Sequence, residues 1–394
     1  MSNNNKTPAI RFKGFTDTWE QRELKELASF AKGSGYSKND IKEQGTPLIL
    51  YGRLYTKYET KIYEVDTFAE PQKGSIYSKG CEVIVPASGE TSEDIARASY
   101  VAKSGILLGG DLNIIYPNDT IEPTFLALSI SNGEQQKNLA KKAQGKSVVH
   151  LHNSDLETVN IVYPTRTEQA RIGQYFDHLD TLITLHKRKY DKLIQFKAAM
   201  LKKMFPQNGA DKPEIRFKGF TDAWEQRKVQ DVADRFDNLR IPVAANLRVH
   251  GTTPYYGANG IQDYVEGFTH DGEFVLVAED GANDLKNYPV KCVNGRIWVN
   301  NHAHVLQGKA GIADNSFLAL AISQSDIESL LVGGGRAKLN AETLMSIEFR
   351  LPCLQEQYRI GEYLTQLDHL ITLHQRKCDK YKSIKAGLIR KLFP

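Results

Sequence analysis

The sequence lacks the motifs that mark several common enzyme classes. It contains no Gly-x4-Gly-Lys-Ser/Thr phosphate loop and no Gly-x-Gly-x-x-Gly dinucleotide turn. The Asn-Pro-Pro-Tyr/Phe signature of amino-methyltransferases is missing, and so is a nucleophile elbow. These absences argue against a P-loop NTPase, a dinucleotide-dependent enzyme, an amino-methyltransferase and a serine hydrolase of that kind.

Cysteine is scarce as well. The chain has four cysteines, scattered and without a pair at the spacing of a zinc site: Cys81, Cys292, Cys353 and Cys378. The sequence also has neither a signal peptide nor an apolar run long enough to cross a bilayer. We therefore expect a reduced, cytoplasmic protein without zinc and without a membrane partner.

The charge balance is too mild to identify a partner. Lys and Arg number 51 against 47 Asp and Glu, which gives a net charge of +4. Apolar residues make up 41% of the 394 positions, enough for the cores of two or three domains.

A long helical pattern occurs twice. At an offset of 188 residues, Glu168–Pro206 and Glu356–Pro394 are identical at 22 of 39 positions. Apolar residues recur in alternating steps of three and four, which indicates a coiled coil rather than a helix on a globular core. A proline ends each copy. We expect helices over 167–205 and 355–393 that pack on each other and act as a spacer.

Polar residues interrupt both helical seams at matching positions. They are His186 and His374, and Lys197 and Lys385. Polar seam residues lower stability but can fix the register of a coiled coil. We expect a structural role for them and favour it over metal binding for the histidines.

A second repeat precedes each variable region. The segment Ile10–Arg22 returns as Ile215–Arg227 with a single substitution, so the chain consists of two half-chains. The predicted parts are a lead with domain 1 (10–166), helix 1 (167–205), a linker (206–214), a lead with domain 2 (215–354) and helix 2 (355–394).

The two variable domains align at an offset of 192 residues. Val83–Gly89 lies over Val275–Gly281, and Phe125–Ser131 lies over Phe317–Ser323. Core-type residues recur while loops differ, which is the pattern of one fold with two binding specificities. Short β-rich runs predict α+β domains with a mostly antiparallel or mixed sheet. The runs are 82–85, 106–108, 113–116, 274–278 and 296–299, and short helices are expected at 125–130 and 317–322.

Two pairs of residues are the only support for catalysis by this chain alone. His302 and His304 could be two metal ligands, but no Cys or carboxylate stands at ligand spacing, so we favour ordinary strand residues. Glu279-Asp280 resembles half of a nuclease acid pair. Its counterpart in the other half is Ala87-Ser88, so we favour loop groups that accept hydrogen bonds from bases or cap turns.

Residues in the first domain suggest nucleic-acid recognition. Tyr51, Arg53 and Lys57 interleave aromatic and basic groups at the end of a predicted strand. Arg commonly reads guanine, and Lys contacts phosphates. The matching polar loops after two equivalent strands add further candidates, namely Ser88, Glu90 and Thr91 in domain 1 and Asp280 and Asn283 in domain 2.

The second domain supplies a different set. Residues 251–261 form a predicted Gly-rich loop, in which the backbone can approach a phosphate and Asn can read adenine. Its candidates are Thr253, Tyr255, Tyr256 and Asn259. Basic residues near the ends of both domains could hold phosphates: Lys141, Lys142, Lys146, Arg336 and Lys338.

Several motifs together carry a family resemblance. Glu-Gln-x-Arg-Ile-Gly occurs at 168–173 and 356–361, each with a proline four residues before the Glu. Lys-Gly-Phe-Thr-Asp-x-Trp-Glu occurs at 13–20 and 218–225. From Ile10 to the last residue, the chain resembles the specificity subunit of type I restriction–modification systems.

The resemblance implies two target-recognition domains joined by two long antiparallel coiled-coil helices in a pseudo-two-fold repeat. Each domain would read one half of a bipartite, asymmetric site in double-stranded DNA, and the helices would set the gap. Two adenine-methylating modification subunits and ATP-dependent restriction subunits would be the partners. The chain itself would be non-catalytic, with S-adenosylmethionine, ATP and Mg on those partners. Docking residues are predicted at Arg171, Tyr175, Arg359 and Tyr363.

Two alternatives stay open at this point. A coiled-coil adaptor would use the same helices and bind no DNA. A stand-alone nucleic-acid enzyme would rest on the two residue pairs named above.

Overall fold

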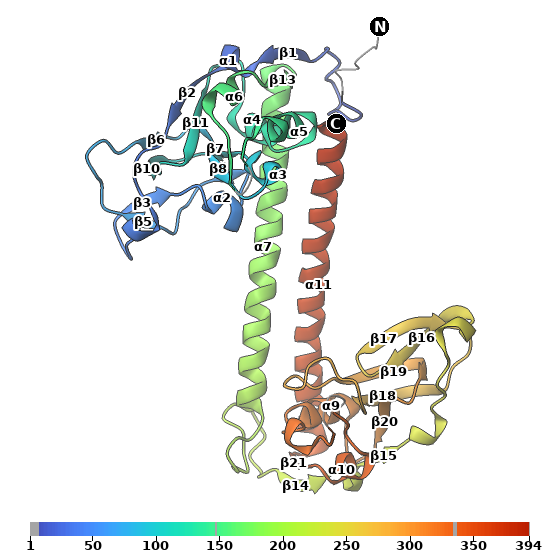
Figure 1. The fold of residues 1–394 in the computed structure, drawn as a ribbon. Helices are drawn as coiled ribbons and strands as arrows, with labels where there is room; N and C mark the ends of the chain where they lie inside the picture. The colour runs from blue at the N-terminus through green and yellow to red at the C-terminus, as the bar shows by residue number, and fades with distance from the viewer. Residues whose placement is uncertain (1–7, 146–147, 334–336, 394) are drawn as a thin grey trace. The chain divides into compact units, whose positions relative to one another are not determined.

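The protein consists of two compact units, each with one α+β domain and parts of both long helices (Figure 1). The computed structural model describes residues 8–145, 148–333 and 337–393. Unit 1 contains the residues up to Lys187 and those from Arg376 onward, and unit 2 is Arg188–Gln375. The long helices are α7 (Arg166–Met204) and α11 (Leu354–Leu392). Each lies within one residue of its predicted bounds.

Domain 1 lies between the first lead and α7 and contains two main sheets. Its strands are β1 (Glu20–Glu23), β2 (Ala28–Lys32), β3 (Thr46–Ile49), β4 (Lys61–Ile62), β5 (Phe68–Ala69), β6 (Tyr77–Lys79), β7 (Val83–Pro86), β8 (Ser88–Gly89), β9 (Ser99–Val101), β10 (Ser104–Leu108), β11 (Leu112–Pro117), β12 (Val149–His150) and β13 (Asn160–Tyr163). Its helices are α1 (Leu24–Leu27), α2 (Arg53–Thr56), α3 (Ser92–Ile95), α4 (Pro123–Ile130), α5 (Gly133–Lys142) and α6 (Asn153–Glu157). The strand orders are β2-β11-β7-β9-β4 and β5-β3-β10-β6.

Domain 2 lies between the second lead and α11 and contains one main sheet. Its strands are β14 (Glu225–Lys228), β15 (Ala233–Arg235), β16 (His250–Gly257), β17 (Gly260–Val265), β18 (His270–Ala278), β19 (Val290–Val299), β20 (Ala303–Gly308) and β21 (Glu348–Leu351). Its helices are α8 (Val229–Val232), α9 (Asn315–Ser323) and α10 (Ala341–Ser346). The strand order is β15-β20-β18-β19-β16-β17.

Both domains share one sheet topology. In β2-β11-β7-β9-β4 and in β15-β20-β18-β19-β16, the first three neighbouring pairs are antiparallel and the last pair is parallel. A separate antiparallel ribbon joins the end of each lead to the last strand of its domain, β1 to β13 and β14 to β21. The predicted α+β fold with a mixed sheet is confirmed. Each predicted β-rich run overlaps a strand, and the predicted short helices are α4 and α9.

The prediction of a Gly-rich loop at 251–261 is wrong. These residues form the β16–β17 hairpin, in which Gly257 pairs with Gly260 across a tight turn. Thr253, Tyr255 and Tyr256 are β-branched or aromatic residues that favour a strand. The Asn-Gly pair at 259–260 is a common signal for a hairpin turn, and it places the two strands side by side.

The long helices pack antiparallel within each unit. In unit 1, Asp180 on α7 lies 2.6 Å from Lys385 on α11, and His186 stacks on Tyr381, so rising numbers on α7 meet falling numbers on α11. In unit 2, Lys197 lies 2.5 Å from Asp368. The two ion pairs are related by the 188-residue repeat. The seam lysines therefore form matched cross-helix pairs, in agreement with a role in fixing the register.

An aromatic cluster sits where each domain meets the helices. In each cluster, a phenylalanine of α4 or α9 contacts a tryptophan of the lead and a phenylalanine at the end of the other long helix. The clusters are Trp19, Phe125 and Phe393 in unit 1, and Trp224, Phe317 and Phe205 in unit 2, with ring centroids 5.4–5.8 Å apart. The end of α11 is therefore part of the core of unit 1, and the end of α7 is part of the core of unit 2.

A buried ion pair fixes each lead to the first turn of its helix. The Arg11 guanidinium donates to both carboxylate oxygens of Glu168 at 2.9 and 2.5 Å, and Arg216 does the same to Glu356 at 2.9 and 2.6 Å. Both glutamates are fully buried. The hydrogen bonds that each arginine donates to its glutamate raise the pKa of that arginine. Bidentate pairs of this kind combine strength with a fixed geometry.

The next residue of the motif fixes the domain to the helix. The Gln169 amide oxygen accepts the Glu122 backbone N–H at 2.8 Å. Its amide nitrogen donates to the carbonyls of Thr120 and Pro164 at 3.1 and 2.9 Å. Gln357 makes the three equivalent bonds in unit 2. Every polar atom of these buried amides is used in holding the start of α4 or α9 against the long helix.

The glycine that ends the motif permits this close approach. A Cβ at Gly173 would lie 2.8 Å from Glu122 Oε2, and one at Gly361 would lie 2.8 Å from Asp314 Oδ1. These two carboxylates cap α4 and α9 by accepting backbone N–H bonds at 2.7 and 2.8 Å. The Glu-Gln-x-Arg-Ile-Gly motif thus has a structural explanation: it is the joint between domain and helix.

Replacement of Gln169 by Ala tests this joint. The change leaves one buried N–H and two carbonyls without their partner, so we expect unit 1 to lose about 2–4 kcal/mol of stability. Urea unfolding combined with hydrogen exchange of the α4 amides measures the loss. Gln195→Ala, at an exposed glutamine of α7, is the control. Equal stability of the two variants would contradict the assigned role.

Candidate nucleic-acid interface

Polar loops occupy the same position at the edge of both domains. In domain 1, Ser88 pairs with His150 between β8 and β12, and their side chains approach to 3.3 Å. In domain 2, Asp280 forms the equivalent backbone bridge with Lys338. The flanking bond is also repeated, because Leu151 N–H donates to Ala87 O as Leu339 N–H donates to Glu279 O. The matching predicted loops therefore lie at the same edge of each domain. The side chains at that edge differ between the two domains.

A cleft in domain 1 contains three of the predicted contacts. Tyr51, Ser88 and Glu90 line it, between the end of β3, the β8 loop and α3. Its other lining residues are Tyr36, Ser37, Lys38, Leu50, Gly52, Tyr55, Thr56, Gly89, Asp94, Arg97, Gly110, Asp111 and Val148. Its volume is about 740 Å³. The residues that line the cleft include cations, such as Arg97, and carboxylates, such as Asp94.

The carboxylates in this cleft differ in their engagement. Asp94 is paired with Arg97 at 2.9 Å, whereas the side chains of Glu90 and Asp111 form no hydrogen bond with the described part of the chain. The Tyr55 hydroxyl donates to Ser88 O at 2.8 Å, and burial raises the pKa of Tyr55. Among the carboxylates that line the cleft, Glu90 and Asp111 are therefore available to a ligand.

Arg53 does not face the cleft, so its predicted role as a base reader is wrong for this conformation. Its side chain is buried, and its guanidinium donates to Asp66 at 2.7 Å, to Glu59 at 2.6 Å and to the Glu64 carbonyl. Lys57 also pairs with Asp66 at 2.7 Å, and bonds from Lys57 and Arg53 lower the pKa of Asp66 to about 2. These groups hold the segment after α2 together.

Thr91 has a local structural role. Its hydroxyl oxygen accepts the Asp94 backbone N–H at 3.1 Å and caps the N-terminus of α3. It supports the loop that carries Glu90. Lys146 and Arg336 lie outside the described residues.

The predicted contacts of domain 2 converge at the hairpin turn. Asn259 donates to the Gly281 carbonyl at 2.9 Å and accepts the Asn283 N–H at 2.8 Å, so the turn and the 280s loop are joined. Asp280 Oδ1 lies 2.5 Å from His302 Nδ1. Lys338 bridges to this loop through the backbone and through an ion pair with Glu279 at 2.8 Å. Four of the predicted residues thus form one polar edge.

Tyr255 and Tyr256 are core residues rather than contacts, which corrects their prediction. Tyr255 is 1% exposed, its hydroxyl accepts the Val243 N–H at 2.9 Å, and its ring stacks on Trp298. Tyr256 is packed in the sheet core, and burial raises its pKa. Thr253 is half-buried on β16. The end of β16 is buried at successive positions from Tyr255 to Gly257, which the sequence pattern did not show.

Two of the four residues that suggested independent catalysis, His304 and Glu279, belong to a buried charge network, whereas His302 and Asp280 form a more exposed pair. His304 lies with Nδ1 2.7 Å from Asp237 and Nε2 2.9 Å from the Leu339 carbonyl. Glu279 pairs with Arg240 at 2.6 Å and with Lys338. Burial would raise the pKa values of Asp237 and Glu279, but these hydrogen bonds hold both below their usual range.

The register of the sheets explains His304. Its counterpart in domain 1 is Asn113, because Val277 pairs with His304 as Val85 pairs with Asn113. Asn113 is also buried and donates to the Leu151 carbonyl at 2.9 Å. Both residues therefore hold the segment that leads to the long helix. Among the described residues no group of three or more His, Cys, Asp or Glu side chains is arranged to hold a metal.

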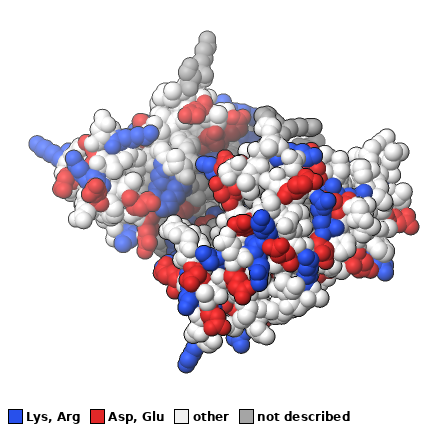
Figure 2. All heavy atoms as spheres, turned by 90° about the horizontal axis from the view of Figure 1, so that it is seen from below, with Lys and Arg blue, Asp and Glu red and all other residues white. Residues whose placement is uncertain are grey.

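Sequence reasoning missed a group of exposed apolar side chains in domain 2. Leu247 and Val249 are 70% and 62% exposed before β16, next to Arg248, whose guanidinium lies 4.1 Å from the Tyr255 ring centre. Arg296 lies over exposed Phe268 at 4.7 Å. The alternation of apolar and basic residues at 239–249 was the available signal. On the face drawn in Figure 2, acidic and basic groups are intermixed rather than gathered by sign.

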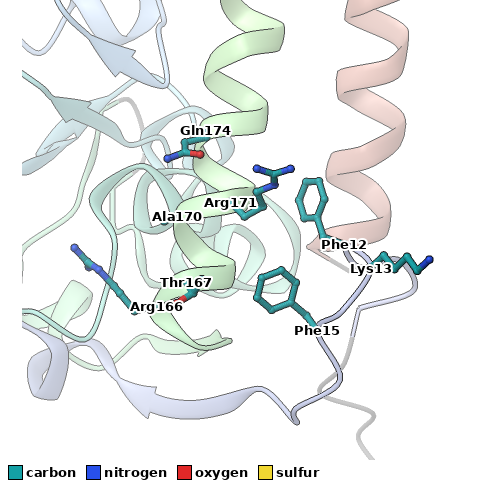
Figure 3. A pocket seen from close by; sticks show the side chains of 8 residues that line it. All are labelled: Phe12, Lys13, Phe15, Arg166, Thr167, Ala170, Arg171 and Gln174. Atoms are coloured by element: carbon teal, nitrogen blue, oxygen red, sulfur yellow. The ribbon is translucent and has the colours of Figure 1, made fainter.

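Three of the four predicted docking residues, Arg171, Tyr175 and Tyr363, lie at the contact between lead and helix. Arg171 lies over the Phe12 ring at 5.8 Å, and Tyr175 meets the same ring edge-on at 5.6 Å. In unit 2, Tyr363 meets Phe217 in the same way at 5.8 Å. An open pocket in unit 1 is lined by Phe12, Lys13, Phe15, Arg166, Thr167, Ala170, Arg171 and Gln174 (Figure 3).

Comparison with known proteins identifies the family. The family model for the type I restriction modification DNA specificity domain matches residues 16–195 and 221–382, once in each half-chain. The chain belongs to this family. The resemblance noted in the sequence is confirmed, and the chain has a specificity role rather than a catalytic one.

Individual relatives agree with this assignment. The chain is 44% identical over 146 residues to a Haemophilus influenzae protein named for the specificity subunits of type I restriction enzymes, covering 37% of this chain and 38% of the relative. It is 19% identical over 328 residues to the type I restriction enzyme MjaVIII specificity subunit of Methanocaldococcus jannaschii, covering 74% of each.

A solved structure shares the fold. The S subunit of a type I restriction–modification system from M. genitalium superposes with a TM-score of 0.72 at 14% identity, over 98% of this chain and 99% of that one. Within the described residues, no helix is both long and apolar enough to span a membrane.

Proposed function

We propose that this chain is the DNA-reading subunit of a type I restriction–modification complex in which each domain reads one half of a bipartite, asymmetric duplex site. The observation that carries the proposal is one sheet topology built twice with different loops at the equivalent edge. Base edges are distinguished by side-chain hydrogen bonds, so a constant frame with variable loops can read two different sequences.

Each domain offers a distinct set of polar groups for this task. In domain 1, Tyr51, Ser88 and Glu90 face the cleft, and a free carboxylate such as Glu90 can accept from an exocyclic amino group of cytosine. In domain 2, Asn283 and Lys338 lie on the polar edge near the hairpin turn. Phosphate contacts would add a strong dependence of affinity on salt.

The long helices are proposed to set the unread gap between the half-sites. Each has 39 residues, which corresponds to about 58 Å of helix. The matched ion pairs Asp180–Lys385 and Lys197–Asp368 support a fixed register between them. A fixed register would make the gap a property of helix length.

The catalytic functions are proposed to belong to partner subunits. Two modification subunits would dock at the equivalent surfaces around Arg171 and Tyr175 and around Arg359 and Tyr363, because a repeated surface suits two identical partners. Restriction subunits would join that assembly. S-adenosylmethionine, ATP and Mg would be bound by these partners in the cytoplasm, with no cofactor on this chain.

Exchange of domain 1 tests the independence of the two readers. Replacing residues 23–165 with the corresponding domain of another family member should change one half-site and leave the other unchanged. Selection of bound duplexes from a random library, with the assembled complex, reads both half-sites. The reciprocal exchange of residues 228–353 is the matched control. A change in both half-sites after either exchange would refute independent reading.

Lengthening the helices tests the spacer. Insertion of seven residues after Lys187 and after Gln375 keeps the heptad phase and adds about 10 Å, or roughly three base pairs, to the gap. The same insertion in α7 alone should disrupt the register and weaken binding. Duplexes with stepped gap lengths measure the preference by competition. An unchanged gap in the double insertion would contradict the spacer role.

A single substitution tests the cleft. Glu90→Gln replaces an acceptor by a group that also donates, so base discrimination at one position of the first half-site should fall by roughly tenfold or more. Glu43→Gln, at an exposed glutamate outside the cleft, is the control. Competition with single-base variants of the site gives the readout. Unaltered preference at every position would exclude Glu90 as a reader.

A further inference from the structure

The docking surface of unit 1 has a counterpart in unit 2 that is only partly identical. We define pocket 1 as the surface formed by Phe12–Phe15 and Arg166–Gln174, and surface 2 as the equivalent surface at 217–220 and 354–362. Each lies wholly within its own unit. Phe12, Phe15, Lys13 and Arg171 have identical counterparts in surface 2, namely Phe217, Phe220, Lys218 and Arg359.

Four exposed or half-exposed helix positions differ between the two surfaces. One change, Thr167 to Gln355, exchanges one neutral polar side chain for another, and the other three change size or charge. Arg166, Ala170 and Gln174 line pocket 1, and the repeat places Leu354, Tyr358 and Glu362 at these positions in surface 2. Tyr358 is 52% exposed, so its ring projects where Ala170 leaves space in pocket 1. In surface 2 the Tyr358 ring therefore stands where Ala170 stands in pocket 1, and the Glu362 carboxylate stands where Gln174 has a neutral amide.

The charges of the two surfaces differ accordingly. The residues lining pocket 1 include three cations, Lys13, Arg166 and Arg171, and no carboxylate. Surface 2 keeps two cations and gains the Glu362 carboxylate. Figure 3 shows the Phe12 and Phe15 rings facing α7, with Lys13 and Arg166 extending away from the pocket at its margins. Pocket 1 is thus complementary to a segment that carries carboxylates around an apolar side chain.

We infer that the two modification subunits bind this chain unequally, the first at pocket 1 and the second, more weakly, at surface 2. The occupant of pocket 1 is an acidic segment of the modification subunit with an apolar residue placed against Phe12 and Phe15. The same segment meets the Tyr358 ring and the Glu362 carboxylate at surface 2. The inference rests on the proposed docking of two identical subunits at the repeated surfaces.

Unequal sites give the assembly an order. At a limiting concentration of modification subunit, the complex with one copy of each chain accumulates, and its modification subunit lies on unit 1. The complete assembly forms only when the concentration exceeds the weaker dissociation constant. Exposed charge differences of this size correspond to roughly a tenfold ratio of the two dissociation constants at low salt. Salt screening should reduce that ratio.

Titration of the full chain with purified modification subunit, followed by native mass spectrometry, tests the inference. The wild-type chain should show two dissociation constants that differ roughly tenfold. The triple variant Arg166→Leu, Ala170→Tyr, Gln174→Glu should show two equal, weak sites. The reciprocal variant Leu354→Arg, Tyr358→Ala, Glu362→Gln should show two equal, tight sites. All six positions lie at the surface, and circular dichroism verifies that the variants fold.

A matched control and the contradicting outcomes complete the test. Gln195→Glu makes the same chemical change as Gln174→Glu at an exposed position of α7 outside pocket 1, and it should leave the two-site pattern unchanged. Equal sites in the wild-type chain, or unequal sites that persist unchanged in both triple variants, would overturn the inference and leave the docking of two subunits intact. A complete lack of binding by the wild-type chain would instead overturn the proposed docking itself.

Discussion

The buried joint between lead, domain and long helix is the constraint on which this structure depends. Glu168 receives the bidentate arginine of the lead, and Gln169 holds the start of α4. Because both side chains are buried and their polar atoms are used, the joint allows little change in geometry. The same joint at Glu356 and Gln357 gives both domains one orientation on their own helices. A reader can therefore change its loops without losing its attachment.

Repetition with divergence follows from where the structure is buried. The sheet core and the joint recur in both halves because packing and satisfied hydrogen bonds limit their residues. Loops at the open edge have fewer such limits. Ser88 and His150 in one domain can thus correspond to Asp280 and Lys338 in the other without a change of backbone pairing. The same logic applies to pocket 1 and surface 2, where exposed helix positions diverge around constant aromatic residues.

The features that could be predicted from the sequence are those that depend on local apolar periodicity or on the internal repeat. The seam of α7 and α11, the short helices α4 and α9 and the shared fold of the domains all follow from apolar spacing. The roles of Arg53 and Tyr255 could not be predicted, because their partners, Asp66 and Val243, are brought to them only by the folded chain. For Glu90, the repeat predicted the loop that carries it. The cleft that this loop lines could not be predicted, because the end of β3 and α3 form it only in the folded chain.

The most direct test of the account is single-molecule sequencing of methylated adenines in DNA from cells that express this chain with its modification subunit. Two domains that each read one half-site predict a bipartite motif of two different specific parts around an unread gap, with one modified adenine on each strand. A continuous motif, or a motif with a single specific part, would contradict the claim that both domains read DNA.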